Sequence, residues 1–291
     1  MQKKIFCTVL SLCAMLLLLT FAAGAYEFTT VEKDGKTWSQ ISTAEDLVNL
    51  MNDPTKWGSK SAFVNYVLTT DIDLSTYTGP LKQHPIGNQP DTERFRGTFD
   101  GAGYEISGLD MSREGFVGLF GYVVNAEIKD LTVSGQVSAT GNYAGGIVGV
   151  SFGSVTIDNC VNKCTVSAPN SNYVGGIIGF ANLSGLPSGT YAVVIRDSVN
   201  EGDVIGKSMV GGIVGRFNAS SANKNLSATF EGCTNNGDVA ADAPAEHVYV
   251  GGIIGISNVG TEKKTAGCAT KISGCVNNGA VSGNAVGKYF A

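Results

Sequence analysis

Short apolar blocks that contain paired glycines recur along the second half of the chain. The sequence Val-Gly-Gly-Ile-Ile-Gly at 174–179 returns at 210–215 and 250–255, with Ile or Val at its fifth position. A related block, Ala-Gly-Gly-Ile-Val-Gly, lies at 144–149, and a degenerate Gly-Leu-Phe-Gly lies at 118–121. The recurrence of one pattern along the chain predicts a repeat protein.

A second apolar block follows each glycine block, and much of it alternates with the two-residue period of extended chain. Each copy opens at an apolar residue and closes at a valine: 128–137, 157–166, 195–204, 230–239 and 272–281. The distance between the two kinds of block varies from copy to copy. The fixed blocks therefore predict stacked strands, and the variable segments predict surface loops.

Turn-forming pairs near the start of each second block, such as Asp158-Asn159 and Arg196-Asp197, predict a bend in every copy. Short strands with corners at fixed offsets, and almost no helical periodicity, are typical of a parallel β-solenoid. We therefore predict an all-β fold: a right-handed parallel β-helix of about five to seven coils with a short N-terminal capping helix.

One asparagine recurs at the same offset in four copies of the second block. Stacked coils lie ~4.8 Å apart, so each residue type meets its own kind above and below. We expect these asparagines to form a structural ladder of side-chain amides at a corner, where asparagine also tolerates left-handed backbone. The ladder residues are Asn162, Asn200, Asn235 and Asn277.

Cysteines share a second offset in the same blocks. Five of the 7 cysteines lie beyond residue 25, an odd number that cannot all pair internally. We expect Cys160, Cys233 and Cys275 to be buried thiols that act as small apolar rungs of the structural ladder. A spacing of ~4.8 Å between coils also fits a disulfide, so the bonding of Cys233 and Cys275 stays open.

The first part of the chain differs from the repeats. Ser42 and Glu45 match a capping box, which predicts a short helix through Met51. We expect this helix to cover the open end of the first coil and protect its strand edges. The predicted organisation is an N-terminal cap with the first coils at 26–111, then repeated coils at 112–291 that are cut off before the next repeat.

The first 25 residues resemble a secretory signal peptide. Lys3 and Lys4 precede an apolar run that ends at Phe21, and Ala-Gly-Ala at 23–25 suits signal peptidase. We predict cleavage of residues 1–25 and an extracellular protein, with an uncleaved anchor as the alternative. The formal net charge of −5 argues against a nucleic-acid partner.

Together these segments resemble a known group of proteins. The runs at 38–41, 71–74, 85–87 and 95–109, followed by the repeated Gly-Gly-Ile and Cys/Ser-x-Asn blocks, are similar to the GLUG-motif proteins of bacterial surfaces. Such repeats occur in adhesins, in large surface proteins and beside the peptidase domain of immunoglobulin-A-specific metallopeptidases. The resemblance implies a right-handed parallel β-helix, secreted or on a bacterial cell surface, with further domains of a longer polypeptide among its potential partners.

Catalytic chemistry has little support in the sequence. The two histidines, His84 and His247, lack the partners of a helical zinc-peptidase motif. Asp203 and Asp238 share one offset in consecutive coils and could bind a cation or act as a glycosidase pair, but solvated carboxylates beside a turn are the favoured interpretation. We therefore predict no catalytic residue, no metal site and no cofactor.

The variable segments at 180–194, 216–229 and 256–271 leave the coil at one corner, so stacking should gather them into a single rim. Polar, adaptable loops with a few aromatic residues suit glycan or protein recognition. The favoured function is a non-catalytic module for adhesion or spacing that binds a host or cell-surface glycan or protein. The alternative is a polysaccharide-acting enzyme of the β-helix type. The candidate ligand-binding residues are Phe180, Tyr191 and Phe217.

Overall fold

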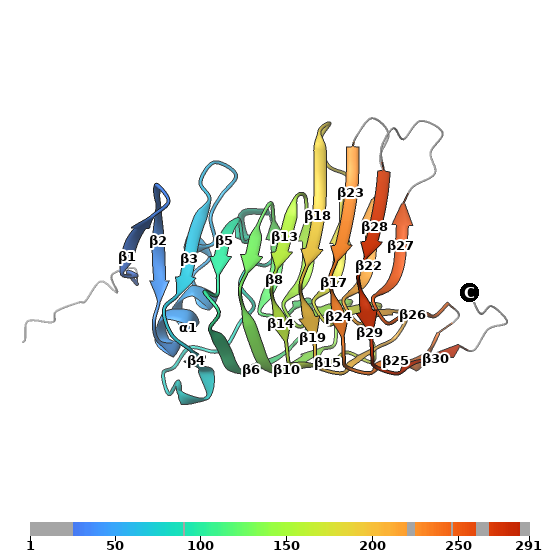
Figure 1. The fold of residues 1–291 in the computed structure, drawn as a ribbon. Coiled ribbons are helices and arrows are strands. Elements are labelled where there is room, and N and C mark those ends of the chain that lie inside the picture. Colours follow the sequence, from blue (N-terminus) through green and yellow to red (C-terminus); the bar gives the residue numbers. More distant parts are fainter. Residues whose placement is uncertain (1–25, 90, 220–224, 246, 260–267, 286–291) are drawn as a thin grey trace, which may run out of the picture.

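The chain winds into an elongated coil of stacked, mostly parallel strands (Figure 1). The computed structural model describes residues 26–285 apart from 90, 220–224, 246 and 260–267. Four sheets run along the coil, and successive turns of the chain add strands to them in a repeating order. This arrangement confirms the predicted parallel β-helix.

Sheet A has nine strands. Its first strand, β1, is antiparallel to β2, and the pairings from β2 onward are parallel. In pairing order the strands are β1 (Thr30–Lys33), β2 (Lys36–Ile41), β3 (Val64–Leu68), β5 (Gly97–Asp100), β9 (Glu127–Lys129), β13 (Val155–Asp158), β18 (Thr190–Arg196), β23 (Asn225–Glu231) and β28 (Cys268–Ser273).

Three further sheets complete the coil. Sheet B has 11 strands: β4 (Ile72–Asp73), β6 (Glu105–Arg113), β10 (Thr132–Ala139), β14 (Val161–Asn162), β15 (Thr165–Ser167), β19 (Val199–Asn200), β20 (Val204–Gly206), β24 (Thr234–Asn235), β25 (Val239–Ala245), β29 (Val276–Asn277) and β30 (Val281–Ala285). Sheet C contains β8 (Phe120–Val124), β12 (Val148–Phe152), β17 (Ile178–Asn182), β22 (Val214–Ala219) and β27 (Ile254–Val259). Sheet D contains β7 (Phe116–Val117), β11 (Tyr143–Gly145), β16 (Tyr173–Gly175), β21 (Met209–Gly211) and β26 (Tyr249–Gly251).

Helical segments occur before β5. Within the described residues they are α1 (Ala44–Asn52) and the 3₁₀ segments η1 (Pro54–Lys56), η2 (Leu74–Thr76) and η3 (Asp91–Glu93). None of the helices in this part of the chain is long and apolar enough to span a membrane.

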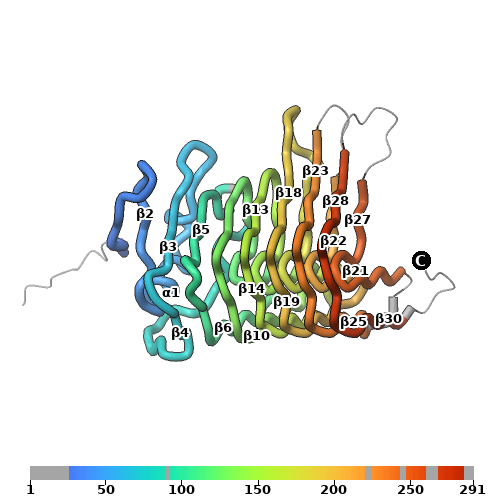
Figure 2. Tube along the Cα trace, in the orientation of Figure 1, coloured from blue at the N-terminus to red at the C-terminus, as the bar shows by residue number. Residues whose placement is uncertain are grey.

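The repeated apolar residues lie directly over one another. Ile157 pairs with Ile128 of β9 on one side and with Ile195 of β18 on the other, and Ile195 pairs in turn with Phe230. All four side chains are fully buried. Figure 2 shows the backbone of these stacked turns. The sequence period therefore places equivalent side chains of successive turns in one column, where they pack on one another.

The second glycine of each Gly-Gly pair lies against the recurring asparagine. A Cβ at Gly176 would lie 2.3 Å from Cγ of Asn200 and 2.2 Å from the carbonyl oxygen of Gly212. Any side chain at this glycine would displace the amide or the neighbouring backbone, so the two repeated sequence signals describe one corner. The same arrangement recurs for Gly146 with Asn162, Gly212 with Asn235 and Gly252 with Asn277.

The four asparagines form a column of hydrogen bonds. Nδ2 of Asn162 donates to Oδ1 of Asn200, and Nδ2 of Asn200 donates to Oδ1 of Asn235 (2.7 Å each). Nδ2 of Asn235 continues the column to Asn277 (2.7 Å). Each Nδ2 also donates to a carbonyl two residues further along its own coil, such as that of Gly202 for Asn200. These bonds offset the cost of burying the amides of the first three residues.

Left-handed backbone falls at the turn before the ladder. The second residue of each turn pair has a positive φ, which is 50° at Asn159, 48° at Asp197 and 62° at Gly232. The ladder asparagines lie in short strands such as β14 and β19 instead. The expectation that left-handed backbone favours asparagine at the ladder is therefore wrong. The ladder asparagines have extended backbone, in which side chains alternate between the two faces, and this alternation points their amides into the core.

Helix α1 begins with a different capping pair from the one the sequence suggests. Thr43 is the N-cap, and its Oγ1 accepts the backbone N–H of Asp46 (3.0 Å). The carboxylate of Asp46 accepts the backbone N–H of Ser42 (2.9 Å). Asp46 therefore has the role predicted for Glu45, and the helix extends to Asn52.

The position of α1 also refines the prediction of a cap. Along the chain the helix follows β2 and precedes β3, and its side chains Leu47, Val48, Leu50 and Met51 are buried in the core. The edge of sheet A beyond β2 is covered by β1, which runs antiparallel. In sheet A the strand edge that we expected the helix to protect is thus paired with a strand.

All five cysteines within the described residues are free thiols. Burial raises the pKa of Cys160, Cys164 and Cys233 to about 12, which keeps these thiols protonated and unreactive. Sγ of Cys233 donates to the carbonyl oxygen of Ile195 (3.4 Å), so the thiol is satisfied without a disulfide to Cys275.

Candidate functional site

The corner between sheets C and A changes length from coil to coil. Residues 125–126 join β8 to β9 and residues 153–154 join β12 to β13, whereas residues 183–189 join β17 to β18. The loop at 57–63, before β3, and the upper end of β18 rise above the strands between them (Figure 1). Two raised segments therefore flank two short corners.

Two hollows lie along this part of the surface, and we call them together the rim groove. They measure about 540 and 550 Å³ and share Phe63 and Asn125. The first, the basic hollow, is lined by residues that include Lys60, Phe63, Arg94, Arg96, Phe152 and Tyr191. The second, the polar hollow, is lined by residues that include Lys36, Asn65, Thr98, Glu127 and Ser154.

Aromatic side chains from separate segments meet in the basic hollow. Phe63, on the raised loop, is 54% exposed, which is unusual for so large an apolar side chain. Phe152 and Tyr191 are half-buried on the other sides of the hollow. A Cβ at Gly189 would lie 3.2 Å from the ring of Tyr191, so a small residue leaves room for this ring. The rings give the groove apolar surfaces against which a ligand can pack.

Two arginines also line the basic hollow. Arg94 and Arg96 flank Phe95, which is fully buried and donates its backbone N–H to the carbonyl oxygen of Tyr122 (3.0 Å). In extended chain, residues two apart point to the same side. The guanidinium carbon of Arg94 lies 4.4 Å from the ring centroid of Tyr122 and 6.0 Å from that of Phe152. These cation–π contacts fix the orientation of Arg94.

The structure places the three predicted ligand-binding residues in three different environments. Tyr191 lines the rim groove. Phe180 lies outside the groove, in a stack of rings described below. Phe217 is fully buried, with its ring centroid 6.4 Å from that of Phe230, so the prediction for Phe217 is wrong. The segment is strand β22 rather than a loop, and alternation directs Phe217 inward and Arg216 outward.

Phe180 belongs to a row of stacked rings on the outer surface of sheets C and D. The ring centroids of Tyr143 and Tyr173 lie 5.1 Å apart with planes at 19°, and those of Tyr173 and Phe180 lie 5.2 Å apart. Nη1 of Arg216 donates to the hydroxyl of Tyr173 (3.2 Å) and its guanidinium covers Phe180 (5.5 Å). Because the ring faces contact one another, this row stabilises the stacking of coils and offers little surface to a ligand.

The strands that carry the predicted rim extend in register. Thr190 of β18 pairs with Asn225 of β23, and β17, β22 and β27 pair in the same way on the other side of the corner. The tips at 220–224 and 260–267 lie outside the described residues. The groove therefore lies on the N-terminal side of this rim, where Tyr191 is.

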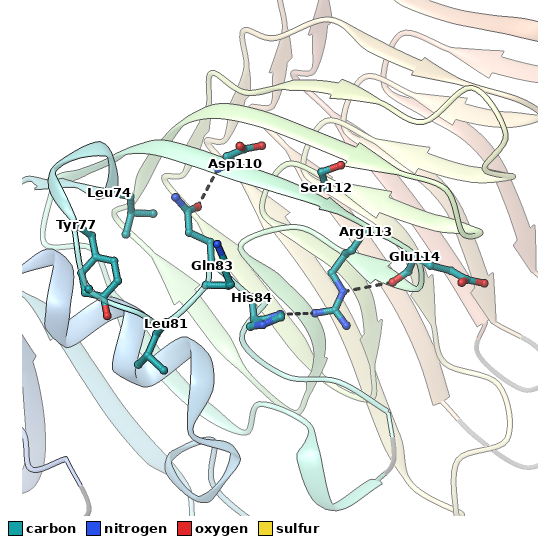
Figure 3. A pocket seen from close by; sticks show the side chains of 11 residues that line it. Leu74, Tyr77, Leu81, Gln83, His84, Asp110, Ser112, Arg113 and Glu114 are labelled. Atoms are coloured by element: carbon teal, nitrogen blue, oxygen red, sulfur yellow. Dashed lines mark hydrogen bonds between the residues drawn. The ribbon is translucent and has the colours of Figure 1, made fainter. Parts of the chain in front are cut away.

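A third hollow, of about 750 Å³, lies between the segment after η2 and strand β6 (Figure 3). Nη1 of Arg113 lies 3.0 Å from Nδ1 of His84, and Oε1 of Gln83 accepts the backbone N–H of Asp110 (2.9 Å). Burial, with the charge of Arg113, lowers the pKa of His84, so the imidazole is neutral at neutral pH. Several polar groups of this hollow thus bind one another.

Asp203 and Asp238 lie in successive coils and act as backbone caps. Oδ1 of Asp203 accepts the backbone N–H of Asp238 (2.9 Å), and Oδ1 of Asp238 accepts that of Ala280 (2.8 Å). These bonds explain the repeated aspartate without catalysis or a cation. No three or more His, Cys, Asp or Glu side chains of the described ranges gather where they could hold a metal ion.

The fold belongs to the class of parallel β-helices and is shared with a solved structure. A candidate immunoglobulin A1 protease from Bacteroides ovatus superposes with a TM-score of 0.61 and 20% sequence identity, over 86% of this chain and 68% of that one. At this identity the likeness concerns the fold alone.

A curated relative covers part of the repeats. An alignment 164 residues long, which covers 53% of this chain, gives 33% identity to Halomucin of Haloquadratum walsbyi, of which this chain spans 2%. No family model matches the chain. The part of the GLUG-motif resemblance that the comparisons support is the β-helix fold, which the candidate protease shares. The comparisons do not assign the chain to a family.

Proposed function

We propose that this chain is a non-catalytic β-helix module, secreted or on a bacterial cell surface, that serves in adhesion or spacing and binds a glycan through the rim groove. The observation that carries the proposal is Phe63, a large apolar side chain that is 54% exposed where two hollows meet. Apolar surface in this setting, surrounded by polar groups, is typical of a ligand-binding groove.

The polar groups of the groove favour a glycan over an apolar ligand. Asn65, Thr98, Asn125 and Ser154 line the polar hollow and offer both hydrogen-bond donors and acceptors. Hydroxyl and amide groups of this kind match the hydroxyl groups of a sugar. The groove also crosses successive coils and is open at the surface, which suits an extended chain.

The role as one module among several has separate support. The chain is similar to a small part of Halomucin, a far longer protein. A stack of coils also separates what lies at its two ends by a fixed distance per coil. Spacing and glycan binding are compatible, because the groove lies on the side of the solenoid.

The test of the proposal is glycan-array screening of the purified chain, followed by isothermal titration with each glycan that binds. We expect Phe63→Ala to weaken binding by about 10-fold or more, as loss of a central anchor does. Val31→Ala is the matched control, because Val31 is also apolar and exposed (40%) but lies in β1. Unchanged affinity in Phe63→Ala would place the site elsewhere, and binding of no glycan would overturn the proposal.

A polysaccharide-acting enzyme remains the second candidate, favoured by the third hollow alone. That hollow brings Asp110, Glu114 and His84 to one surface, as Figure 3 shows. An enzyme would release new reducing ends or unsaturated products from a polysaccharide, and Asp110→Asn would abolish this release. Under our proposal the chain binds glycans and leaves their length unchanged.

A further inference from the structure

We propose that the basic hollow binds the carboxylate of an acidic sugar, such as a uronate unit of a polysaccharide. This inference rests on the proposed glycan binding and specifies the class of glycan. Lys60, Arg94 and Arg96 all line this hollow, and neither Asp nor Glu is among the described residues that line it. Since the whole chain has a formal net charge of −5, this concentration of positive charge is local.

The two arginines are positioned before any ligand arrives. Arg96 is 3% exposed, its backbone N–H donates to the carbonyl oxygen of Trp57 (2.8 Å), and its Nη1 donates to that of Arg94 (3.3 Å). Arg94 is held against the ring of Tyr122. Side chains that are already ordered lose less conformational entropy when they bind a ligand.

Each of these cations has more N–H donors than a single internal partner takes up. Lys60, Arg94 and Arg96 each make at least one further interaction within the chain. A guanidinium carries five N–H donors in a planar fork, and an ammonium carries three, so each group can hold an internal partner and a ligand together. The fork matches the two oxygens of a carboxylate, which makes a carboxylate the favoured anion.

The surroundings of the cations suit a sugar ring that carries the anion. Phe63 and Tyr191 line the same hollow, and Leu186 and Pro187 form part of its wall. Apolar walls exclude water and so strengthen the attraction between the ligand and the cations. A small anion such as phosphate would use the cations and leave these walls uncovered.

The adjoining polar hollow has a different charge. It is lined by Lys36 and Glu127, one charge of each sign, together with hydroxyl and amide groups. A neutral sugar unit fits these groups better than a second acidic one. We therefore expect an acidic sugar unit to bind in the basic hollow and a neutral unit of the same glycan to bind in the polar hollow, on the other side of Phe63.

The experiment is isothermal titration of the full chain with oligosaccharides that contain galacturonate, mannuronate or glucuronate, each paired with its carboxyl-reduced form. We expect at least one acidic form to bind about 10-fold more tightly than its reduced partner, with an affinity that falls as salt is added. Lys60→Gln should reduce this preference, because it should weaken binding of the acidic form more than binding of the reduced form. Lys271→Gln, which changes an exposed lysine of β28, is the control.

Arg94→Lys and Arg94→Gln separate charge from geometry. Both should lose most of the preference for the carboxylate, because lysine keeps the charge but cannot form the planar fork. Circular dichroism and thermal melting establish whether each variant folds. If Arg94→Gln does not fold, Lys60→Gln still tests the proposal, because the side chain of Lys60 is exposed and its loss should not disturb the fold.

The outcomes distinguish this inference from the proposed function. Equal binding of acidic and reduced forms, with both weakened by Phe63→Ala, would overturn the carboxylate assignment and leave glycan binding intact. Tighter binding of a sulfated neutral oligosaccharide than of every uronate would also overturn it. Binding of no oligosaccharide of either kind would overturn the inference and count against glycan binding itself.

Discussion

The first turns of the chain, before β9, and the repeated coils that follow reach one fold through different packing. In the first turns phenylalanine rings from separate segments pack against one another: the centroids of Phe95 and Phe120 lie 5.1 Å apart, and those of Phe99 and Phe120 lie 5.3 Å apart. In the repeated coils like residues stack on like, as Asn162 does on Asn200. The two regions thus depend on shape complementarity and on register, respectively.

This difference explains where the groove is found. A repeated coil has little freedom, because each rung must match the rungs above and below it, and variation is confined to its corners. The first turns also pair their strands, but the segments between these strands follow no common pattern and contain helices and a raised loop before β3. The rim groove lies where the raised loop at 57–63, which belongs to the first turns, faces the long corner at 183–189, which belongs to the repeated coils.

The largest effect is expected at the centre of the aromatic core. Phe120 is fully buried between Phe95 and Phe99, so Phe120→Ala should lower the free energy of unfolding by about 4 kcal/mol through lost contacts and a cavity. Urea denaturation followed by circular dichroism measures this loss. Phe120→Leu keeps most of the volume and should cost about 1.5 kcal/mol or less. Similar losses for the two variants would show that this core does not depend on shape.

A smaller effect, but one that spreads further, is expected in the ladder. Asn200→Ala removes an acceptor of Asn162 and a donor to Asn235, so it should cost about 2 kcal/mol. Hydrogen exchange should show faster opening of the neighbouring coils and little change near α1, because contacts in a solenoid are mostly between adjacent coils.

The matched control for the ladder is an exposed amide pair in the same coils. Nδ2 of Asn278 donates to Oδ1 of Asn236 (2.8 Å) at the surface, where water can replace the bond. Asn278→Ala should therefore change stability by less than about 0.5 kcal/mol. An equal loss in Asn278→Ala and Asn200→Ala would mean that burial of the amides adds nothing.

The smallest effect concerns pH and the first turns. Burial alone would raise the pKa of Asp100, but the backbone N–H of Ala102 and the ammonium groups of Lys129 and Lys33 outweigh it, and the pKa lies below its usual value. The unfolded chain has an ordinary pKa of about 3.9. The ionised carboxylate of Asp100 therefore stabilises the folded state above about pH 4, and this stabilisation is lost as the pH falls through the lowered pKa of the folded state.

Substitution of Asp100 tests this dependence. Asp100→Asn should cost about 1 kcal/mol or less at pH 7 and should flatten the loss of stability measured by urea denaturation between about pH 4 and pH 2. Asp34→Asn, at an exposed turn between β1 and β2, is the control. A pH profile that is the same for Asp100→Asn and the original chain would show that this carboxylate does not couple to folding.

How far the sequence alone leads also differs between the two regions. In the repeats, a single offset places Asn162 and Asn200 in one column, because identical coils leave one way to stack. Phe217 shows the limit: the variable spacing predicts a loop there, although Arg216, Phe217 and Asn218 follow the polar–apolar alternation of a strand. In the first turns no repeat aligns Phe63 with Tyr191, so their meeting depends on packing that a periodic pattern does not describe.

One feature of the sequence indicates part of the basic hollow, although none of the sequence-based predictions uses it. Arg94-Phe95-Arg96 alternates charged and apolar residues, which indicates an extended segment with both arginines on one side. The sequence does not reveal which other segment faces that side. Lys60 is more than thirty positions away, and only the coil brings it to the same hollow.

The column of asparagines also has a polarity. Nδ2 of Asn162, Asn200 and Asn235 each donates to Oδ1 of the asparagine in the next coil, so these amide dipoles add along the axis of the solenoid as peptide dipoles do in a helix. Neighbouring amides polarise one another, and each rung strengthens those beside it. The two ends of this column are therefore electrostatically distinct, and a coil stacked on Asn277 would have to offer it an oxygen.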